Sequence, residues 1–170
     1  MSRKKSASER HGGTPATSVL DAAGARYALH HYPHEENAAF GPEAAAALGI
    51  EPARVFKTLL VSTGAAGAGS LAVGVVPVDG SLDLKALAAA LGVKKVEMAD
   101  PEVAERRTGY VLGGISPLGQ RHASRTVVDD SALGHPTVFV SGGRRGLEIE
   151  LAPQTLVTLA SATTAGIASR

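Results

Sequence analysis

The apolar and polar positions of this chain follow two patterns, one typical of β-strands and one typical of short helices. Residues 55–61 and 71–78 are the most strand-like runs, and a Gly/Ala/Ser-rich segment separates them. Two β-rich runs with such a connection predict an antiparallel hairpin. Residues 147–151 alternate strictly between apolar and acidic side chains, which predicts a strand with one buried face. Shorter strands are expected at 26–32, 94–98, 126–129 and 137–141.

Short helices are predicted between these strands. In residues 84–91 the leucines recur at helical spacing, Asp83 or Ser81 can cap the first turn, and Gly92 can end the last turn. Interleaved strands and short helices without long βαβ repeats predict an α+β fold around a mixed or antiparallel sheet. The other helices are expected to begin at or near prolines, which suit a first helical turn: Pro15, Pro42, Pro101 and Pro153.

Length and composition point to one folded domain. The chain has 170 residues, 44% of them hydrophobic and 19% charged, which is ordinary for a globular protein. Residues 1–14 show no apolar period and are interpreted as a disordered N-terminal extension, which leaves 15–170 as a single domain. No apolar run is long enough to span a bilayer and the N-terminus lacks a secretory signal, so we expect a cytoplasmic protein without a membrane partner.

The charge balance and the lack of cysteine limit the kinds of ligand and catalytic group that this protein can use. The chain has 17 Lys+Arg and 16 Asp+Glu residues. Residues 1–17 contain four of the basic residues and one of the acidic residues. Residues 18–170 therefore contain 13 basic and 15 acidic side chains. We therefore do not expect the surface as a whole to bind nucleic acid electrostatically, and DNA is not an expected partner. Contacts with phosphates would need local patches of basic residues. Without cysteine the chain has no disulfide, thiolate metal site or cysteine nucleophile.

Lys57 is an anomaly, because it is the only charge in the apolar run 55–61. A buried, unpaired ammonium would be costly. One interpretation is structural: the side chain reaches solvent or a carboxylate. The other is functional: the cation lies at a cleft and binds an anionic ligand.

The glycines of the segment 113–119 form a second anomaly. Gly113 and Gly114 can let the backbone approach a ligand, and successive N–H groups can form an oxyanion site; the alternative is a simple turn. Ser116 is not in a hydrolase nucleophile elbow, because Gly119 follows it by three residues instead of two. The loop 141–146 is interpreted as a hairpin connection, with phosphate contact by its two arginines as the alternative.

Other polar residues give weaker indications. His30, His31 and His34 lie close together in the sequence, but their spacing matches no metalloprotease motif and no fourth ligand is evident. Glu148 and Glu150 share one face of their predicted strand, so they face either solvent or a pocket.

Four segments carry a resemblance to a known family: VFKTLLV at 55–61, KKVEMADP at 94–101, TGYVLGGISPLGQ at 108–120 and VSGGRRGLEIEL at 140–151. In this order they resemble the YbaK family of aminoacyl-tRNA deacylases, and most closely the branch that hydrolyses Cys-tRNA(Pro) and related Cys-tRNAs. The resemblance implies an α+β fold with a mixed, barrel-like sheet flanked by short helices. It also implies a substrate cleft and action in trans on a mischarged tRNA(Pro), with prolyl-tRNA synthetase as a second candidate partner.

The resemblance also assigns roles to residues. Lys57 would grip the terminal adenosine or its phosphate, and Gly113 with Gly114 would approach the ester carbonyl. Two departures concern the amino-acid pocket: Glu148 stands where this branch has aspartate, and Ala39 stands where asparagine is common. The substrate-binding positions implied are Tyr32, Phe40, Thr58, Ser116, Pro117, Ser141 and Glu148.

The family implies neither a metal nor a cofactor. In its mechanism the thiol of the cysteinyl group attacks its own ester, so the protein need only orient the substrate and stabilise the oxyanion. Two alternatives stay open: a deacylase for a smaller amino acid such as alanine, which would need an activated water, and a non-catalytic module that binds tRNA or a synthetase.

Overall fold

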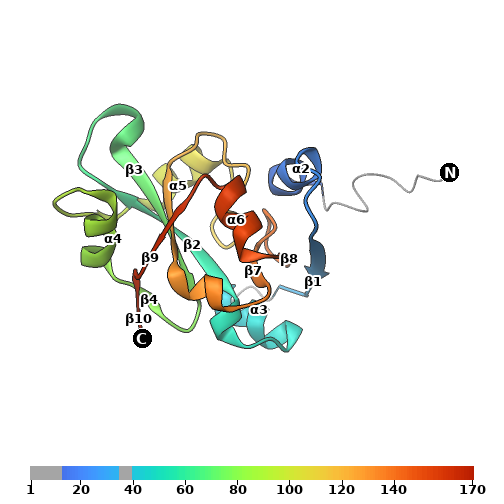
Figure 1. The fold of residues 1–170 in the computed structure, drawn as a ribbon. Coiled ribbons are helices and arrows are strands. Elements are labelled where there is room, and N and C mark those ends of the chain that lie inside the picture. The colour runs from blue at the N-terminus through green and yellow to red at the C-terminus, as the bar shows by residue number, and fades with distance from the viewer. Residues whose placement is uncertain (1–12, 35–39) are drawn as a thin grey trace.

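The computed structural model describes residues 13–34 and 40–170, and its architecture is α+β, as the sequence predicts (Figure 1). Residues 1–12, most of the predicted N-terminal extension, lie outside the described residues. None of the helices in the described ranges has the length and apolar character that a membrane crossing requires.

Thr14 belongs to the folded domain, although the sequence predicts it to be the last residue of the extension. It is the N-cap of α2 (Pro15–Ala22), where its hydroxyl accepts a hydrogen bond from the Thr17 N–H. The same hydroxyl lies 2.6 Å from the Gly142 carbonyl, to which it donates. Thr14 is therefore buried and holds the first helix against a segment more than a hundred residues away.

A five-stranded mixed sheet forms the centre of the molecule, in the order β5-β2-β3-β6-β9. The predicted hairpin is confirmed: β2 (Phe56–Ser62) and β3 (Leu71–Pro77) are antiparallel. β3 is apolar along its whole length because it is buried on both faces between neighbours. β6 (Arg125–Asp129) runs parallel to β3, β9 (Thr163–Ala165) runs parallel to β6, and β5 (Glu97–Met98) pairs with the far end of β2.

A second sheet has three antiparallel strands: β1 (Ala28–His31), β8 (Leu147–Leu151) and β7 (Val138–Ser141). One isolated bridge, between Val55 and Phe139, connects it to the edge of the first sheet.

The described strands therefore do not close into a barrel, and the barrel-like sheet implied by the family resemblance is corrected to separate sheets. The physical reason is that the two larger sheets meet through packed side chains from Phe56, Leu60, Val138 and Val140 instead of a continuous hydrogen-bond ladder. A two-stranded pair of β4 (Ser81–Leu82) and β10 (Ala168–Ser169) completes the strands.

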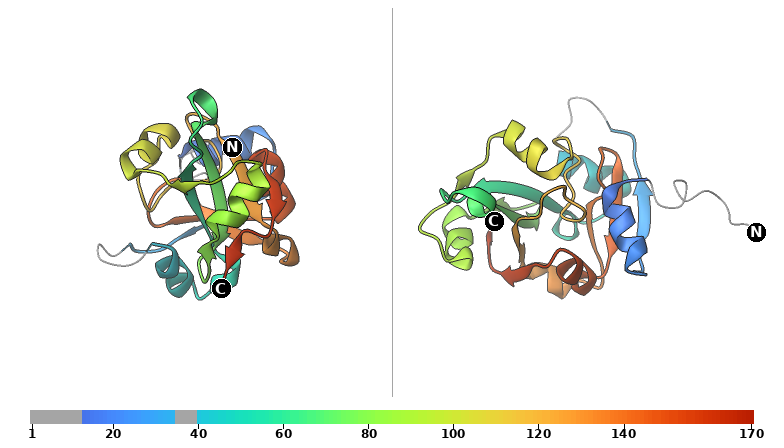
Figure 2. Two further views of the ribbon diagram at one scale, coloured as in Figure 1. Left: turned by 90° about the vertical axis from the view of Figure 1, so that its left-hand side faces the viewer. Right: turned by 90° about the horizontal axis from the view of Figure 1, so that it is seen from above.

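The helices cover both sides of the hairpin. Their bounds are Phe40–Leu48 for α3, Leu84–Leu91 for α4, Pro101–Thr108 for α5 and Pro153–Leu159 for α6. Figure 2 shows α3 and α5 on one side of β2 and β3, and α6 on the other. The predicted caps are confirmed for α4, where the Asp83 side chain accepts from the Ala86 N–H and Gly92 has a φ of 74°. Short 3₁₀ turns lie at Pro52–Arg54 (η1), Gly67–Ser70 (η2) and Asp130–Gly134 (η3).

Buried apolar residues form three clusters. The largest lies between the two larger sheets and includes residues of α2 and α6, and a second lies beneath α4. The third joins Ala44 and Ala45 of α3 to Tyr32, Val55 and Phe139. This third cluster fixes α3 beside the start of β2, where the first turn of α3 forms one wall of a cavity.

Candidate functional site

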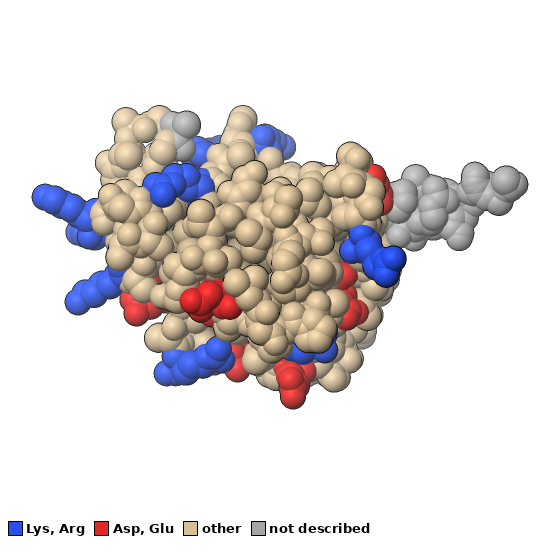
Figure 3. Space-filling view, viewed as in Figure 1, with Lys and Arg blue, Asp and Glu red and all other residues tan. Residues whose placement is uncertain are grey.

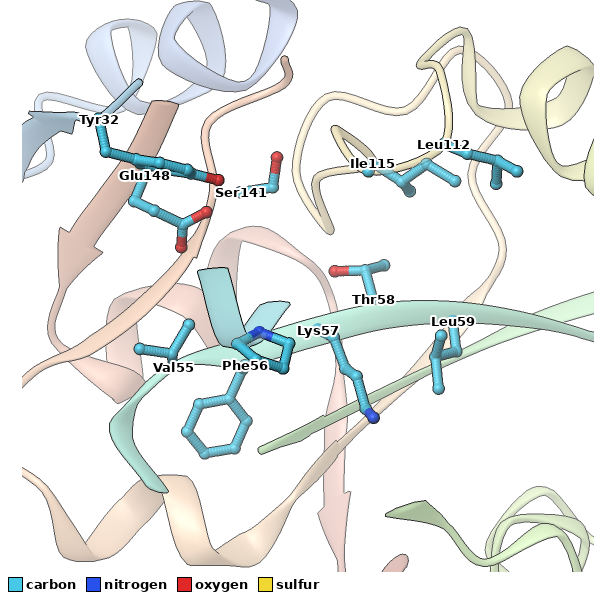
Figure 4. Close-up of a pocket in the computed structure, with 12 residues that line it drawn as sticks. Tyr32, Val55, Phe56, Lys57, Thr58, Leu59, Leu112, Ile115, Ser141 and Glu148 are labelled. Atoms are coloured by element: carbon cyan, nitrogen blue, oxygen red, sulfur yellow. The ribbon is translucent and has the colours of Figure 1, made fainter. Parts of the chain in front are cut away.

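A cavity of about 410 Å³ opens beside the first half of β2. Its walls come from four parts of the chain that are distant in sequence: β2, the N-terminal turn of α3, the segment after α5 and the sheet of β1, β8 and β7. Figure 4 draws the lining residues as sticks and labels ten of them. The lining residues are Tyr32, Pro42, Val55, Phe56, Lys57, Thr58, Leu59, Leu112, Gly113, Ile115, Ser141 and Glu148.

The cavity lies at a gap in the hydrogen bonding of β2. On its outer edge, β2 pairs with β5 only at Val61 and Ser62 and meets β7 only through the bridge at Val55. The Val55 carbonyl accepts from Val78 on the β3 side, whereas the Leu60 carbonyl accepts from the Ala99 N–H on the outer side. Backbone groups alternate in direction along a strand, so Thr58, like Leu60, presents its N–H and C=O to the outer edge. No strand of the described residues pairs with Thr58 there.

Lys57 and Thr58 leave β2 in opposite directions, and both line the cavity (Figure 4). Lys57 is partly buried, and no described residue forms a hydrogen bond or ion pair with its ammonium. The Thr58 hydroxyl is buried without a hydrogen-bond partner in the described part of the chain. A buried polar atom without a partner is uncommon in a folded protein, so both side chains have capacity to bind a ligand.

Glu148 faces Thr58 from the opposite wall (Figure 4). It is 6% exposed, and its Oε1 has no hydrogen-bond partner among the described residues. Burial raises the pKa of this carboxyl to about 8. Glu148 is therefore mostly protonated at neutral pH and can donate a hydrogen bond. Burial also raises the pKa of the neighbouring Tyr32, and the negative charge that Glu148 carries when ionised raises it further.

The glycine segment forms a tight turn at the cavity. The Gly114 N–H donates to the Val111 carbonyl at 2.9 Å, and Gly113 has a φ of 84° at the third position of the turn, as in a type II turn. Gly113 lines the cavity, and its N–H donates no hydrogen bond within the described residues. Gly114 does not line the cavity, and its N–H is occupied by the turn. The structure thus offers one backbone donor here, where the sequence predicts two.

Among the described lining residues, no hydroxyl is hydrogen-bonded to a group that could act as its general base. Thr58, Ser141 and Tyr32 carry the hydroxyls, and no histidine is among the described lining residues. The Ser141 hydroxyl accepts a hydrogen bond from the Gly143 N–H. A hydrolytic reaction in this cavity would therefore take its nucleophile from the substrate or from water.

Comparison with known proteins identifies the family. The model of the aminoacyl-tRNA editing domain matches residues 34–159. EbsC of Enterococcus faecalis, described as a Cys-tRNA(Pro)/Cys-tRNA(Cys) deacylase, is 34% identical over 170 residues, which are 100% of this chain and 99% of EbsC. The chain belongs to the aminoacyl-tRNA editing domain family. The resemblance seen in the sequence motifs is confirmed.

Solved structures share the fold of this editing domain. One, described as a trans-editing enzyme for prolyl-tRNA synthetase, has a TM-score of 0.80 at 24% identity and covers 98% of this chain and 100% of its own. The protein APE2540 has a TM-score of 0.79 at 27% identity, with 91% of this chain and 99% of its own covered.

Six of the ten site residues predicted from the sequence line the cavity of the editing domain: Tyr32, Lys57, Thr58, Gly113, Ser141 and Glu148. Gly114, Ser116 and Pro117 do not line the cavity. Ser116 is 0% exposed, and its hydroxyl accepts from the Leu118 N–H at 3.2 Å, so it holds the local segment 116–118. Ala39 and the side chain of Phe40 lie outside what the structure describes.

Sequence reasoning missed the apolar part of the lining. Pro42 was interpreted only as a helix start, and Leu112 and Ile115 flank the glycine pair without a polar signal. The sequence signal that could have indicated Leu112 and Ile115 is that both lie within two residues of Gly113.

The histidines of the editing domain do not form one site. His30 Nε2 lies 2.9 Å from Glu150 Oε1, and His34 Nδ1 lies 2.7 Å from Glu43 Oε1. Within the ranges that the structure describes, no three potential ligands cluster in a way that could hold a metal ion.

Proposed function

We propose that this editing domain hydrolyses the ester of mischarged aminoacyl-tRNA, acting in trans in the cytoplasm, with Cys-tRNA(Pro) as its substrate. The observation that carries the proposal is the cavity itself: it holds a cation and several unpartnered polar groups, but no nucleophile paired with a base. EbsC, described as a deacylase of Cys-tRNA(Pro) and Cys-tRNA(Cys), supports the choice of substrate.

Lys57 binds the anionic part of the substrate in this proposal. Its ammonium has no ion-pair partner in the described residues, so a phosphate of the terminal adenosine would supply the missing negative charge. A charge-assisted hydrogen bond in a partly buried site is stronger than one in water. The terminal nucleotide would then be fixed at the edge of β2.

The aminoacyl ester lies between β2 and the wall formed by Glu148. The Gly113 N–H can donate to the carbonyl oxygen as negative charge develops on it, which is how oxyanion sites lower a barrier. The Thr58 hydroxyl and backbone, facing the unpaired edge of β2, can bind the amino-acid part. Protonated Glu148 adds a donor from the other side.

The substrate thiol supplies the nucleophile. Its sulfur, as thiolate, attacks the ester carbonyl carbon, a C–S bond forms, and the bond from that carbon to the ribose oxygen breaks. The ribose oxygen takes up the proton that the thiol released on ionising, and the released cyclic thioester is hydrolysed by water. Well-oriented intramolecular reactions reach effective molarities of about 10⁵–10⁸ M, so positioning alone can replace a protein nucleophile.

Single-turnover hydrolysis of Cys-, Ser- and Ala-tRNA(Pro) tests this function. We expect fast deacylation of Cys-tRNA(Pro) and much slower deacylation of the other two, because a thiol with a pKa of about 8.5 is far more ionised than an alcohol and alanine has neither group. Equal rates on Cys- and Ala-tRNA(Pro) would show that water is the nucleophile. Binding of all three without turnover would show a non-catalytic module.

Glu148→Gln tests whether the neutral carboxyl is the active form. Glutamine donates a hydrogen bond at every pH, whereas the carboxyl loses its proton as the pH rises through about 8. We therefore expect the ratio of wild-type to variant kcat/KM to be constant below pH 7 and to fall above pH 8. The ratio cancels the ionisation of the substrate thiol, which both proteins share. A ratio that does not change between pH 6.5 and 9.5 would contradict this role.

A further inference from the structure

Arginines stand beside the cavity mouth, on the loop packed against the glycine turn. The Arg145 Nε donates to the Leu112 carbonyl at 2.8 Å, and Leu112 lines the cavity. Arg144 lies against the same turn, because a Cβ built on Gly114 would be 2.7 Å from the Arg144 Cα. Both arginines are exposed. Two cationic side chains are thus placed at the rim of the cavity.

A second, open hollow continues from this turn along α5. Val111, the first residue of the turn, lines it together with Arg106 near the end of α5 and Arg121. The Arg121 N–H donates to the Thr108 carbonyl at 2.8 Å, which fixes the segment around Arg121 against the end of α5. Arg106 and Arg121 are also exposed. The cationic side chains therefore extend from the rim along one flank, which we call the arginine flank: Arg106, Arg121, Arg144 and Arg145.

The arginine flank has excess positive charge although residues 18–170 as a whole have more acidic than basic side chains. Two carboxylates, Glu102 and Glu105, line the same hollow. Glu105 Oε2 accepts a hydrogen bond from the Leu112 N–H at 2.9 Å, so this carboxylate also holds the turn in place. Among the described residues here, four guanidinium groups against two carboxylates favour an anionic partner.

Apolar surface lies between the two arginine pairs. Val111 is 53% exposed and Leu112 is 36% exposed, and these are two of the few large apolar side chains exposed in the described residues. These side chains can pack against the sugar edges of a nucleic-acid backbone while the neighbouring guanidinium groups pair with its phosphates.

The face seen in Figure 1 offers no comparable surface. Lysines and arginines project mainly from its edges, and its central area is largely without them (Figure 3). This face carries α6, on the opposite side of the hairpin from α3 and α5 (Figure 2).

We infer that the arginine flank binds the phosphate backbone of the tRNA acceptor stem while the aminoacyl end occupies the cavity. The inference rests on the proposed function, which places an aminoacyl-adenosine in the cavity. A cavity of about 410 Å³ is the size of a small-ligand site, so the remainder of the tRNA must run over the surface from its mouth. Arginine is suited to that contact because its planar fork binds phosphate through two hydrogen bonds.

The test compares binding and chemistry in a triple variant, Arg106→Gln/Arg121→Gln/Arg144→Gln, which leaves Arg145 on the Leu112 carbonyl. We expect its affinity for uncharged tRNA(Pro), measured by fluorescence anisotropy, to fall about tenfold or more. The slope of log K against log salt should become less steep by about 0.9 for each phosphate that no longer pairs with an arginine. Hydrolysis of cysteinyl-adenosine, which has no stem, should stay within about twofold of wild type.

A double variant, Lys85→Glu/Lys94→Glu, is the control, because both lysines are exposed and lie on or just after α4, at the far end of the molecule from β7 and β8 (Figure 1). An equal decrease of tRNA affinity in the control, or unchanged affinity and slope in the triple variant, would overturn the inference. Loss of cysteinyl-adenosine hydrolysis in the triple variant, while wild type retains it, would show that these arginines support the cavity instead of the stem and would also overturn the inference. If wild type fails to hydrolyse cysteinyl-adenosine but tRNA affinity depends on the flank, only the proposed function fails.

Discussion

Lys57→Ala is expected to slow single-turnover deacylation of Cys-tRNA(Pro) by about 10²-fold or more, with the fold intact. The ammonium is the only cation among the described lining residues, and it forms no ion pair with a described carboxylate. Removing it would leave the substrate phosphate without a partner in a partly buried site, where water compensates poorly. Stability should change little, because no interaction within the described structure depends on this charge.

Two further variants make the Lys57 prediction specific. Lys57→Arg is expected not to restore the rate, since the guanidinium is wider and planar whereas the ammonium is a compact charge. Lys85→Ala, at an exposed position on α4, should behave as wild type. Circular dichroism on the same samples monitors folding. A Lys57→Ala rate within about threefold of wild type would remove this residue from the mechanism.

Gly114→Ala is expected to cost about 10²–10³ in rate, the usual effect of removing one oxyanion donor. A Cβ at this position would lie 2.7 Å from the Arg144 Cα and 2.9 Å from its carbonyl carbon, and these backbone atoms cannot move aside like a flexible side chain. The turn must shift instead, which displaces the Gly113 N–H from the ester. Gly113→Ala is a poorer probe, because its φ of 84° strains any other residue regardless of substrate.

Gly134→Ala is the matched control for this change. A Cβ built on Gly134 meets nothing within 4 Å, and Gly134 is not among the glycines with positive φ. We expect wild-type kinetics from this variant, and thermal melts of both proteins separate a change in stability from a change in rate. Gly114→Ala with the rate of Gly134→Ala would mean that the position of the turn does not matter to catalysis.

The sequence alone determined the elements whose signals are local. The hairpin of β2 and β3 follows from two apolar runs and their connection, and Asp83 and Gly92 mark the ends of α4 by cap chemistry that acts within one turn. The motifs of the four segments also sufficed to identify the family. By contrast β9 and β10, of three and two residues, carry no pattern of their own and form because longer strands provide edges for them.

The tertiary structure alone decided which polar groups face the cavity. Glu148 and Glu150 have the same place in the alternation of β8, yet Glu148 is buried without a partner for Oε1, whereas Glu150 is paired with His30 and Arg54. Likewise Gly113 and Gly114 are adjacent and identical in type, yet the turn occupies only the Gly114 N–H. Periodicity gives the direction of a side chain relative to its own strand, but the groups it meets come from distant segments, and their distance and burial set its pKa and its chemistry.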